Sequence, residues 1–263
     1  MNLGLKGRRA LLLAATKGLG RAAAEALAAE GAAVAVCSSS AERCRETAAS
    51  LATTHGVKAV GIAADMFDPQ SMDTLFREAS AALGGIDILF INHPGPALGQ
   101  AQDIDVDVLE QQFRLMVASP LRLISRALPS MRERQWGRIL SVGGAGMVTP
   151  LPNKVMDDTL RPALVGYSKA LANEVAADGV TVNMVLPGTF VTDRVHDSTA
   201  SNARLWGITV EEAMRRRIEN IPAGRFGELK EFGAVVAFLC SDVASYLNGS
   251  VVRVDGSQIK SVY

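Results

Sequence analysis

The sequence predicts an α/β fold in which one parallel sheet of seven strands has helices on both faces. Seven short apolar runs alternate along the chain with longer segments whose apolar residues recur at helical spacing. A glycine-containing turn joins the first apolar run to the first helical segment. Strands that alternate with helices favour a parallel sheet, and right-handed crossovers make such a sheet doubly wound.

The elements follow one another in a regular order. The predicted strands are residues 9–13, 33–37, 59–63, 87–91, 138–142, 180–186 and 251–254, and several are rich in Val or Ile. The predicted helices are residues 19–30, 41–54, 69–83, 106–134, 160–177 and 229–240. Residues 193–220 lie between the last two strands and carry a helical pattern of their own around residues 210–218.

Composition narrows the class of protein. The chain of 263 residues has 27 Lys and Arg against 27 Asp and Glu, so no net charge would attract nucleic acid or an anionic membrane. No apolar run approaches the roughly 18 residues of a membrane span, and the N-terminal residues do not resemble a signal peptide. Cys37, Cys44 and Cys240 lack metal-ligand spacing, so we expect reduced core thiols and no metal. These features favour a cytoplasmic enzyme with a small-molecule substrate.

The turn at residues 14–20 is the strongest binding motif, and we call it the glycine turn. Glycines between a strand and a helix let backbone N–H groups approach a phosphate at the positive helix end. Ala14 adds a methyl group where the backbone must turn tightly. The residues expected to contact a nucleotide here are Ala14, Thr16, Lys17, Gly18, Leu19 and Gly20.

Residues 11–20, 183–188 and 222–256 resemble the short-chain dehydrogenase/reductase family, most of all its 3-oxoacyl reductase branch. The resemblance implies one Rossmann-type nucleotide-binding domain over residues 1–263, with a substrate lid at residues 193–220. It further implies hydride transfer between a nicotinamide dinucleotide and a carbonyl or alcohol substrate. The assembly that it implies is a homotetramer, with a homodimer as the next choice.

The resemblance also assigns cofactor contacts outside the glycine turn. These are Asp65 and Met66 for the adenine, Asn92 in the loop after the fourth strand, and Pro187, Gly188 and Thr192 for the nicotinamide carboxamide. His93 stands beside Asn92 and is either a chemical group near the nicotinamide or a solvent-facing or structural histidine.

The end of the second strand bears on the choice of cofactor. NAD-specific relatives usually have an acidic residue near the position of Ser38. NADP-specific relatives often have an arginine at the position of Ser39. Lys17 and Arg43 are suited to neutralise a 2′-phosphate, which favours NADP(H) over NAD(H). The alternative is that residues 38–40 only cap the next helix and Arg43 is solvated.

Family members use an Asn, a Ser, a Tyr and a Lys for their chemistry. The flanking motifs set these four positions at Met116, Gly144, Asp157 and Arg161, so all four residue types differ. Tyr167 is not a substitute acid, because on a helix it would lie about 15 Å beyond Asp157.

Asp157 and Arg161 are the candidate catalytic residues. Their i, i+4 spacing puts both on one helix face if that turn is helical. Pro162 disfavours a helix there, and Thr159 would instead cap a helix that leaves Asp157 on a loop. The plainer alternative is that Asp157 and Asp158 are acidic residues favoured by the dipole at a helix start.

Two functions of different classes therefore remain open. The leading hypothesis is an oxidoreductase with a non-standard site, in which Arg161 holds ribose hydroxyls and Asp157, a water or another group handles the proton. The alternative is a nucleotide-binding protein without redox activity, such as a subunit or sensor. A lyase or isomerase that uses the same pocket ranks third.

Overall fold

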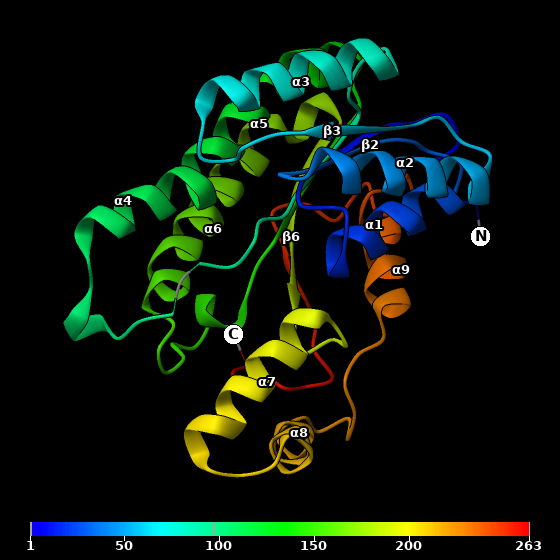
Figure 1. Ribbon diagram of the computed structural model, residues 1–263. Coiled ribbons are helices and arrows are strands. Elements are labelled where there is room, and N and C mark those ends of the chain that lie inside the picture. The colour runs from blue at the N-terminus through cyan, green and yellow to red at the C-terminus, as the bar shows by residue number, and fades with distance from the viewer. Residues whose placement is uncertain (1, 97, 263) are drawn as a thin grey trace.

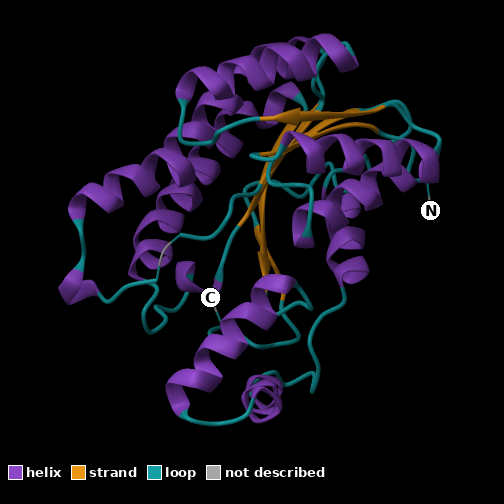
Figure 2. Ribbon diagram, in the orientation of Figure 1, coloured by secondary structure: helices purple, strands orange, loops and turns teal. Residues whose placement is uncertain are grey.

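The computed structural model describes residues 2–96 and 98–262, except for the side chain of Arg194. All seven strands are parallel and lie in the order β3-β2-β1-β4-β5-β6-β7. Figure 2 shows the strands gathered in one twisted sheet with helices around it. They are β1 (Arg9–Leu12), β2 (Ala33–Ser38), β3 (Ala59–Ala63), β4 (Ile88–Ile91), β5 (Gly137–Val142), β6 (Val180–Pro187) and β7 (Val251–Val254). The predicted sheet is confirmed, and no strand boundary differs from its prediction by more than about one residue, within the usual scatter of boundary assignments.

Helices cover both faces of the sheet and give three layers (Figure 1). On one face lie α3 (Pro69–Leu83), α4 (Val106–Phe113), α5 (Ser119–Glu133) and α6 (Val155–Val175). On the other lie α1 (Gly18–Ala29), α2 (Ala41–His55) and α9 (Leu229–Leu239). Two further helices, α7 (Asp193–Trp206) and α8 (Val210–Glu219), occupy the segment between β6 and β7.

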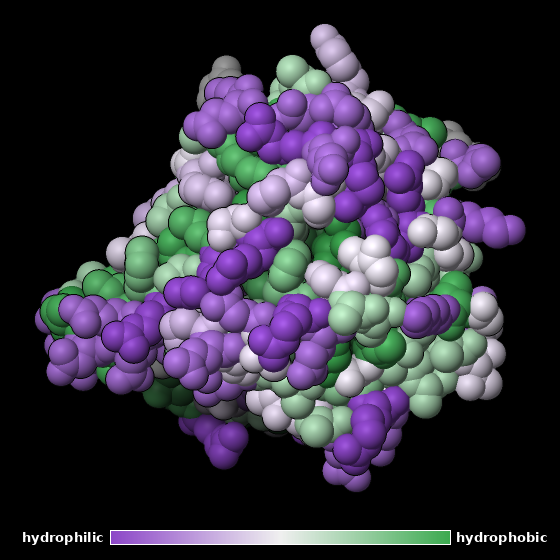
Figure 3. All heavy atoms as spheres, turned by 90° about the horizontal axis from the view of Figure 1, so that it is seen from above, coloured by the Kyte–Doolittle hydropathy of each residue, from purple (hydrophilic) through white to green (hydrophobic). Residues whose placement is uncertain are grey.

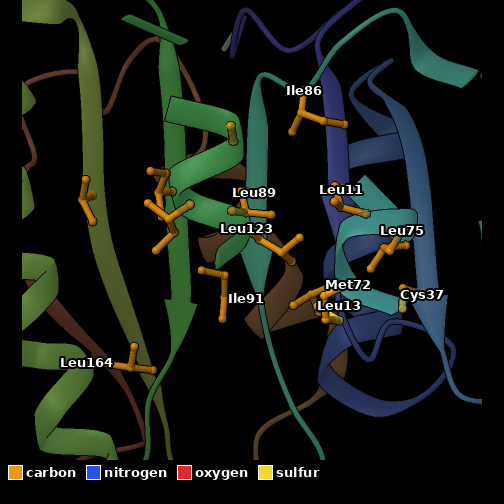
Figure 4. Packing of buried hydrophobic residues seen from close by; sticks show 14 of the residues in the cluster. Leu11, Leu13, Cys37, Met72, Leu75, Ile86, Leu89, Ile91, Leu123 and Leu164 are labelled. Carbon is orange, nitrogen blue, oxygen red and sulfur yellow. The ribbon is translucent and has the colours of Figure 1, made fainter. Parts of the chain in front are cut away.

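The core divides into two apolar clusters, one on each face of the sheet. Leu11 and Leu89 face the cluster that includes residues of α3, α5 and α6, whereas their neighbours Leu12 and Phe90 face α1, α2 and α9. Figure 4 shows the first cluster, with strand side chains directed at helix residues such as Leu75 and Leu123. Successive strand residues point to opposite faces, which explains why these strands read as continuous apolar runs.

The strand order fixes where a ligand would bind. The chain runs outward from β1 to β3 on one side and from β4 to β7 on the other, so the direction reverses between β1 and β4. In open α/β sheets the crevice beyond the carboxyl ends of the strands at such a point is the usual ligand site. The glycine turn after β1 and the loop after β4 both lie there.

Two predicted helices differ from the structure. The single helix expected over residues 106–134 is divided into α4 and α5 by a π-helical turn, η2 (Arg114–Ala118). The helix expected over residues 160–177 starts earlier, at Val155, so Thr159 lies inside α6 and does not cap it. Pro162 lies inside this helix, where the buried apolar residues Leu160 and Leu164 anchor α6 to the core.

Charged, polar and apolar residues are mixed on the one face that Figure 3 shows, which is the molecule seen from above. Among the helices of the described residues, none is long and apolar enough to cross a membrane. Within residues 2–96 and 98–262 no group of three or more His, Cys, Asp or Glu residues is placed to hold a metal ion.

Candidate functional site

The glycine turn owes its shape to close backbone contact. Ala14 has a φ of 47° and Gly18 a φ of 54°, both in the left-handed region. Ala14 is therefore strained, as the sequence led us to expect, because a side chain disfavours that region. A Cβ on Gly20 would lie 2.2 Å from the carbonyl oxygen of Ala14, so only glycine fits where α1 begins. Thr16, Lys17 and Leu19 lie between these fixed points, and the Lys17 side chain is exposed.

Neighbouring strands hold the turn in place. The side-chain amide of Asn92 donates to the Ala14 carbonyl over 3.3 Å, and the Ala15 amide donates to the Cys37 carbonyl over 2.9 Å. The methyl group of Thr192 lies 3.6 Å from the position of a Cβ on Gly18. The structure thus brings together three predicted segments, after β1, β4 and β6, around one turn.

The end of β2 lies beside the glycine turn. Ser40 caps α2 by accepting a hydrogen bond from the Arg43 amide at 3.3 Å, and the Ser38 hydroxyl is 3.3 Å from the Ser40 amide. Ser39, Arg43 and Lys17 are exposed, and neither cation has an ion pair with a described residue. Capping by Ser40 is confirmed, and it leaves two unpaired cations at this corner.

Asp65 and Met66 follow β3 and differ in what they expose. One Asp65 carboxylate oxygen accepts from the Phe67 amide at 2.9 Å, while the residue itself is exposed. The Met66 side chain is buried, and its carbonyl accepts from the Ser119 hydroxyl at 2.6 Å. Met66 therefore offers a ligand only its backbone N–H, whereas Asp65 keeps a carboxylate oxygen available.

The segment after β6 is rigid at its base. The Gly188 amide donates to the Val254 carbonyl at 2.9 Å, directly after Pro187, and a Cβ on Gly188 would lie 2.6 Å from the Cα of Asp255. The Thr189 amide donates to the Gln258 side chain at 3.0 Å. The Thr192 hydroxyl accepts from the Val195 amide at 3.3 Å and caps α7. The hydroxyl proton and a second lone pair of the oxygen remain for the expected Thr192 contact.

Asp157 and Arg161 form one buried ion pair on α6. Arg161 Nε donates to Asp157 Oδ1 at 2.6 Å, and Arg161 Nη1 donates to the Val142 carbonyl at the end of β5 at 2.8 Å. Both lie in the helix, which confirms the i, i+4 arrangement and excludes a loop position for Asp157. Because Val142 ends a central strand, the pair lies at the carboxyl edge of the sheet.

Glycines after β5 make room for these side chains. A Cβ on Gly144 would lie 3.1 Å from Arg161 Nε, and one on Gly146 would lie 1.9 Å from Asp158 Oδ1. Sequence reasoning took Gly144 only as a changed serine position and missed the Val142 carbonyl altogether. The spacing of Gly143, Gly144 and Gly146 was the available signal, since such runs occur where a neighbouring side chain approaches the backbone.

Asp158 is a further residue that the sequence reasoning undervalued. Its Oδ2 accepts from the Leu151 amide at 3.0 Å, and its Oδ1 is buried without a hydrogen-bond partner in the described chain. Burial raises the pKa of Asp158, and the charge of Asp157 adds to the effect. Asp158 thus ties the β5–α6 loop, residues 143–154, to α6 at some electrostatic cost.

The other candidates occupy structural positions. His93 is only 6 % exposed and its Nδ1 lies 2.8 Å from the Pro94 carbonyl, so the solvent-facing alternative is wrong. Met116 is fully buried within η2. Burial raises the pKa of Tyr167, and the Glu174 charge contributes, while its side chain packs against the core.

Sequence relatives match nearly all of the chain. Residues 13–257 match the family described as enoyl-(acyl carrier protein) reductase. The 3-oxoacyl-[acyl-carrier-protein] reductase FabG of Aquifex aeolicus is 33% identical over 258 residues, which cover 97% of this chain and 99% of that protein. The D-beta-hydroxybutyrate dehydrogenase of Cupriavidus necator is 30% identical over 256 residues, with coverages of 97% and 99%.

Solved structures agree with the sequence relatives. L-sorbose reductase from Gluconobacter frateurii, complexed with NADPH and L-sorbose, superposes with a TM-score of 0.94 at 28% identity and covers 100% of both chains. YwfH, an NADPH-dependent reductase involved in bacilysin biosynthesis, gives a TM-score of 0.92 at 26% identity, covering 97% of this chain and 99% of that one. The fold, the glycine turn and these matches together show that the chain belongs to the short-chain dehydrogenase/reductase family of oxidoreductases.

Proposed function

We propose that this protein binds NADP(H) at the glycine turn and transfers hydride between the nicotinamide and a carbonyl or alcohol substrate. The observation that carries the proposal is the contact between Gly20 and the Ala14 carbonyl at the point where the strand order reverses. Gly18 and Gly20 carry no side chain at the start of α1, so a pyrophosphate could approach the backbone amides there.

The residues present fit a dinucleotide. Gly18 and Gly20 shape the turn that would hold the phosphates, Asn92 fixes the Ala14 carbonyl, and the exposed Asp65 would contact the adenine. Thr192 borders the same turn, and Gly188 lies four residues before it in the segment after β6. The nicotinamide supplies the hydride acceptor or donor, and the protein supplies binding and orientation.

The proposed preference for NADP(H) over NAD(H) rests on the positive charges of Lys17 and Arg43. Lys17 and Arg43 are exposed, adjacent to the end of β2 and not engaged in ion pairs with described residues. Two unpaired cations beside the Ser39 position favour a phosphate over a ribose hydroxyl. Two of the similar structures are of NADPH-dependent or NADPH-bound reductases, which supports this choice.

At the substrate end, Asp157 and Arg161 are the groups offered to the reacting oxygen. In this pair the carboxylate accepts hydrogen bonds and is the group that would take the proton of an alcohol. Arg161 is suited to donate to a substrate or ribose oxygen, and it does not act as an acid. Proton supply for carbonyl reduction would come through Asp157 or a water.

Melting temperatures in the presence of the four nucleotides test the proposal. A ligand that binds only the native state adds about 2.7 kcal/mol at a hundredfold excess over its dissociation constant. We expect saturable shifts with NADP⁺ and NADPH and smaller ones with NAD⁺ and NADH. No shift with any nucleotide would refute cofactor binding and leave a protein of this family that has lost its site.

A charge reversal separates the 2′-phosphate preference from general electrostatics. Lys17→Glu should remove the difference between NADPH and NADH. The matched control is Lys58→Glu, which makes the same change at an exposed position just before β3. Lys58 lies at the amino end of its strand, whereas Lys17 follows the carboxyl end of β1. If Lys58→Glu lowers NADPH binding equally, overall charge and not a local contact explains the preference.

We also propose a homotetramer, or failing that a homodimer, built on the outer edge of the sheet. Among the described strands β7 pairs with β6 alone, and its residue Val251 is exposed, as are Phe238 and Val243 in the segment between β6 and β7. An edge strand with an exposed apolar side chain is suited to pairing with another copy. Light scattering coupled to size-exclusion chromatography measures the mass, and a monomer would refute this assembly.

A further inference from the structure

The Asp157–Arg161 pair leaves two polar atoms unused. Arg161 donates from Nε to Asp157 Oδ1 and from Nη1 to the Val142 carbonyl. Asp157 Oδ2 and Arg161 Nη2 have no hydrogen-bond partner among the described residues, yet neither is one of the buried orphan atoms. The side chains keep 11 % and 10 % of their surface exposed, respectively. Each of these two atoms therefore keeps some access to solvent.

The free atoms form a fork of one acceptor and one donor. An ion pair locked at 2.6 Å, with the guanidinium also fixed to a strand carbonyl, holds them in a preset geometry. A carboxylate oxygen accepts from a hydroxyl, and a guanidinium donates to a second oxygen. Two oxygens on adjacent carbons satisfy both atoms at once, whereas a lone carbonyl satisfies only the donor.

The charges of the pair restrict the substrate further. Asp157 and Arg161 cancel each other, so the fork adds no net field that would favour an anionic substrate. A phenol at this position would serve any carbonyl oxygen, but a carboxylate repels the lone pairs of an isolated ketone. A substrate without a hydroxyl would also leave Asp157 Oδ2 desolvated and unpaired, which is unfavourable.

We propose that Asp157 Oδ2 and Arg161 Nη2 are a recognition fork for neutral compounds with oxygens on adjacent carbons, either α-hydroxy carbonyls or their vicinal diols. Asp157 accepts the hydroxyl hydrogen bond and Arg161 donates to the neighbouring oxygen. The proposal rests on the proposed function for the cofactor that lies beside the substrate. It deepens that function by excluding simple ketones and 3-oxoacyl thioesters as preferred substrates.

Binding to the NADPH complex tests the fork without turnover. Erythritol and 1,4-butanediol share a four-carbon chain with two terminal hydroxyls, and only erythritol has hydroxyls on adjacent carbons. Neither carries a carbonyl, so NADPH cannot reduce them. Calorimetric or ligand-observed NMR titration is the readout, because polyols raise melting temperatures non-specifically by exclusion from the protein surface.

We expect erythritol to bind at least about tenfold more tightly than 1,4-butanediol, the gain of one hydrogen bond to a charged group. Equal affinities, or tight binding of a 3-hydroxyacyl thioester with none of erythritol, would overturn the proposal. This comparison uses the unaltered protein, so it does not depend on any variant folding. If no nucleotide shifts the melting temperature, the proposed function fails, and the same titration without nucleotide still measures the fork.

Variants localise the effect to Asp157. Asp157→Asn exchanges one carboxylate oxygen for a donor and should abolish the difference between the two ligands. Asp158→Asn is the matched control, since it makes the same change one residue later on a side chain that faces the β5–α6 loop. Loss of the difference in Asp158→Asn but not in Asp157→Asn would refute the assignment.

Discussion

The glycine turn and the β5–α6 corner, which consists of the β5–α6 loop and residues 155–161, lie at the same sheet edge but are built differently. The turn depends on backbone shape, with Gly20 against the Ala14 carbonyl and Gly18 in the left-handed region. The corner depends on side chains, with Arg161 joining Asp157 to the Val142 carbonyl. A contact made by the backbone persists through most substitutions, whereas a contact made by side chains changes with each one. We therefore expect the glycine turn to tolerate changes of sequence better than the corner does.

Removing the Arg161 side chain should cause the largest loss of stability among the variants considered. Arg161→Met leaves a buried carboxylate without its partner, and we expect a loss of about 3–5 kcal/mol in the free energy of unfolding. Asp157→Leu combined with Arg161→Met should recover most of that loss, because no unpaired charge remains. Urea denaturation of the three proteins measures both values. A single variant within about 1 kcal/mol of the parent would mean that solvent already screens the pair.

A methyl group at Gly20 should be the next largest perturbation. The new Cβ would meet the Ala14 carbonyl at 2.2 Å, so the backbone must shift. We expect Gly20→Ala to destabilise the fold by about 1–3 kcal/mol and to weaken nucleotide binding markedly. Gly166→Ala is the control, since a Cβ there meets nothing within 4 Å and alanine favours helix. Nucleotide binding that survives Gly20→Ala would contradict the role assigned to the turn.

Replacing Ala14 by glycine should stabilise the fold, in contrast to the two preceding variants. Ala14→Gly relieves a left-handed alanine, and after the added freedom of the unfolded chain we expect a net gain of about 0.5–1 kcal/mol. Ala29→Gly, at the exposed end of α1, should instead lose stability. Differential scanning calorimetry would register each change as a shift of about 2–4 °C per kcal/mol. A loss of stability in Ala14→Gly would show that the turn carries no strain.

The smallest effect should be the pH dependence at Asp158. Burial raises the pKa of this carboxyl, with Asp157 adding to it, so the folded state holds the proton more tightly than the unfolded state. Its contribution to stability is therefore present at low pH and is lost as the pH rises through the raised pKa. Asp158→Asn should match the parent at low pH and become slightly more stable towards neutrality. A constant difference across pH would contradict this linkage.

Much of the fold followed from local pattern. Short apolar runs and longer periodic segments placed all seven strands and most helices, because burial on both faces leaves a clear mark on sequence. The division of the long helix at residues 114–118 had no such mark, since a π-helical turn arises from tertiary packing. Pro162 predicted a helix boundary that does not exist, because burial of neighbours such as Leu160 outweighs the local preference of proline.

The site divides in the same way. The positions of Gly18 and Gly20 predict the turn from sequence, because the close backbone contact there leaves no room for a side chain. The pairing of Asp157 with Arg161 was a possible reading of their spacing, but the Val142 carbonyl could not be named from sequence. A backbone acceptor carries no residue signature, and where a guanidinium comes to rest depends on the packing around it.

The contact between Gly144 and Arg161 bears on which substitutions this corner tolerates. A Cβ at residue 144 would lie 3.1 Å from Arg161 Nε, closer than side chains normally approach. A larger residue there would require the guanidinium to move by a few tenths of an ångström, and its hydrogen bond to Asp157 would have to absorb that shift. Residues 144, 157 and 161 are therefore coupled, so a substitution at one of them changes what the other two tolerate.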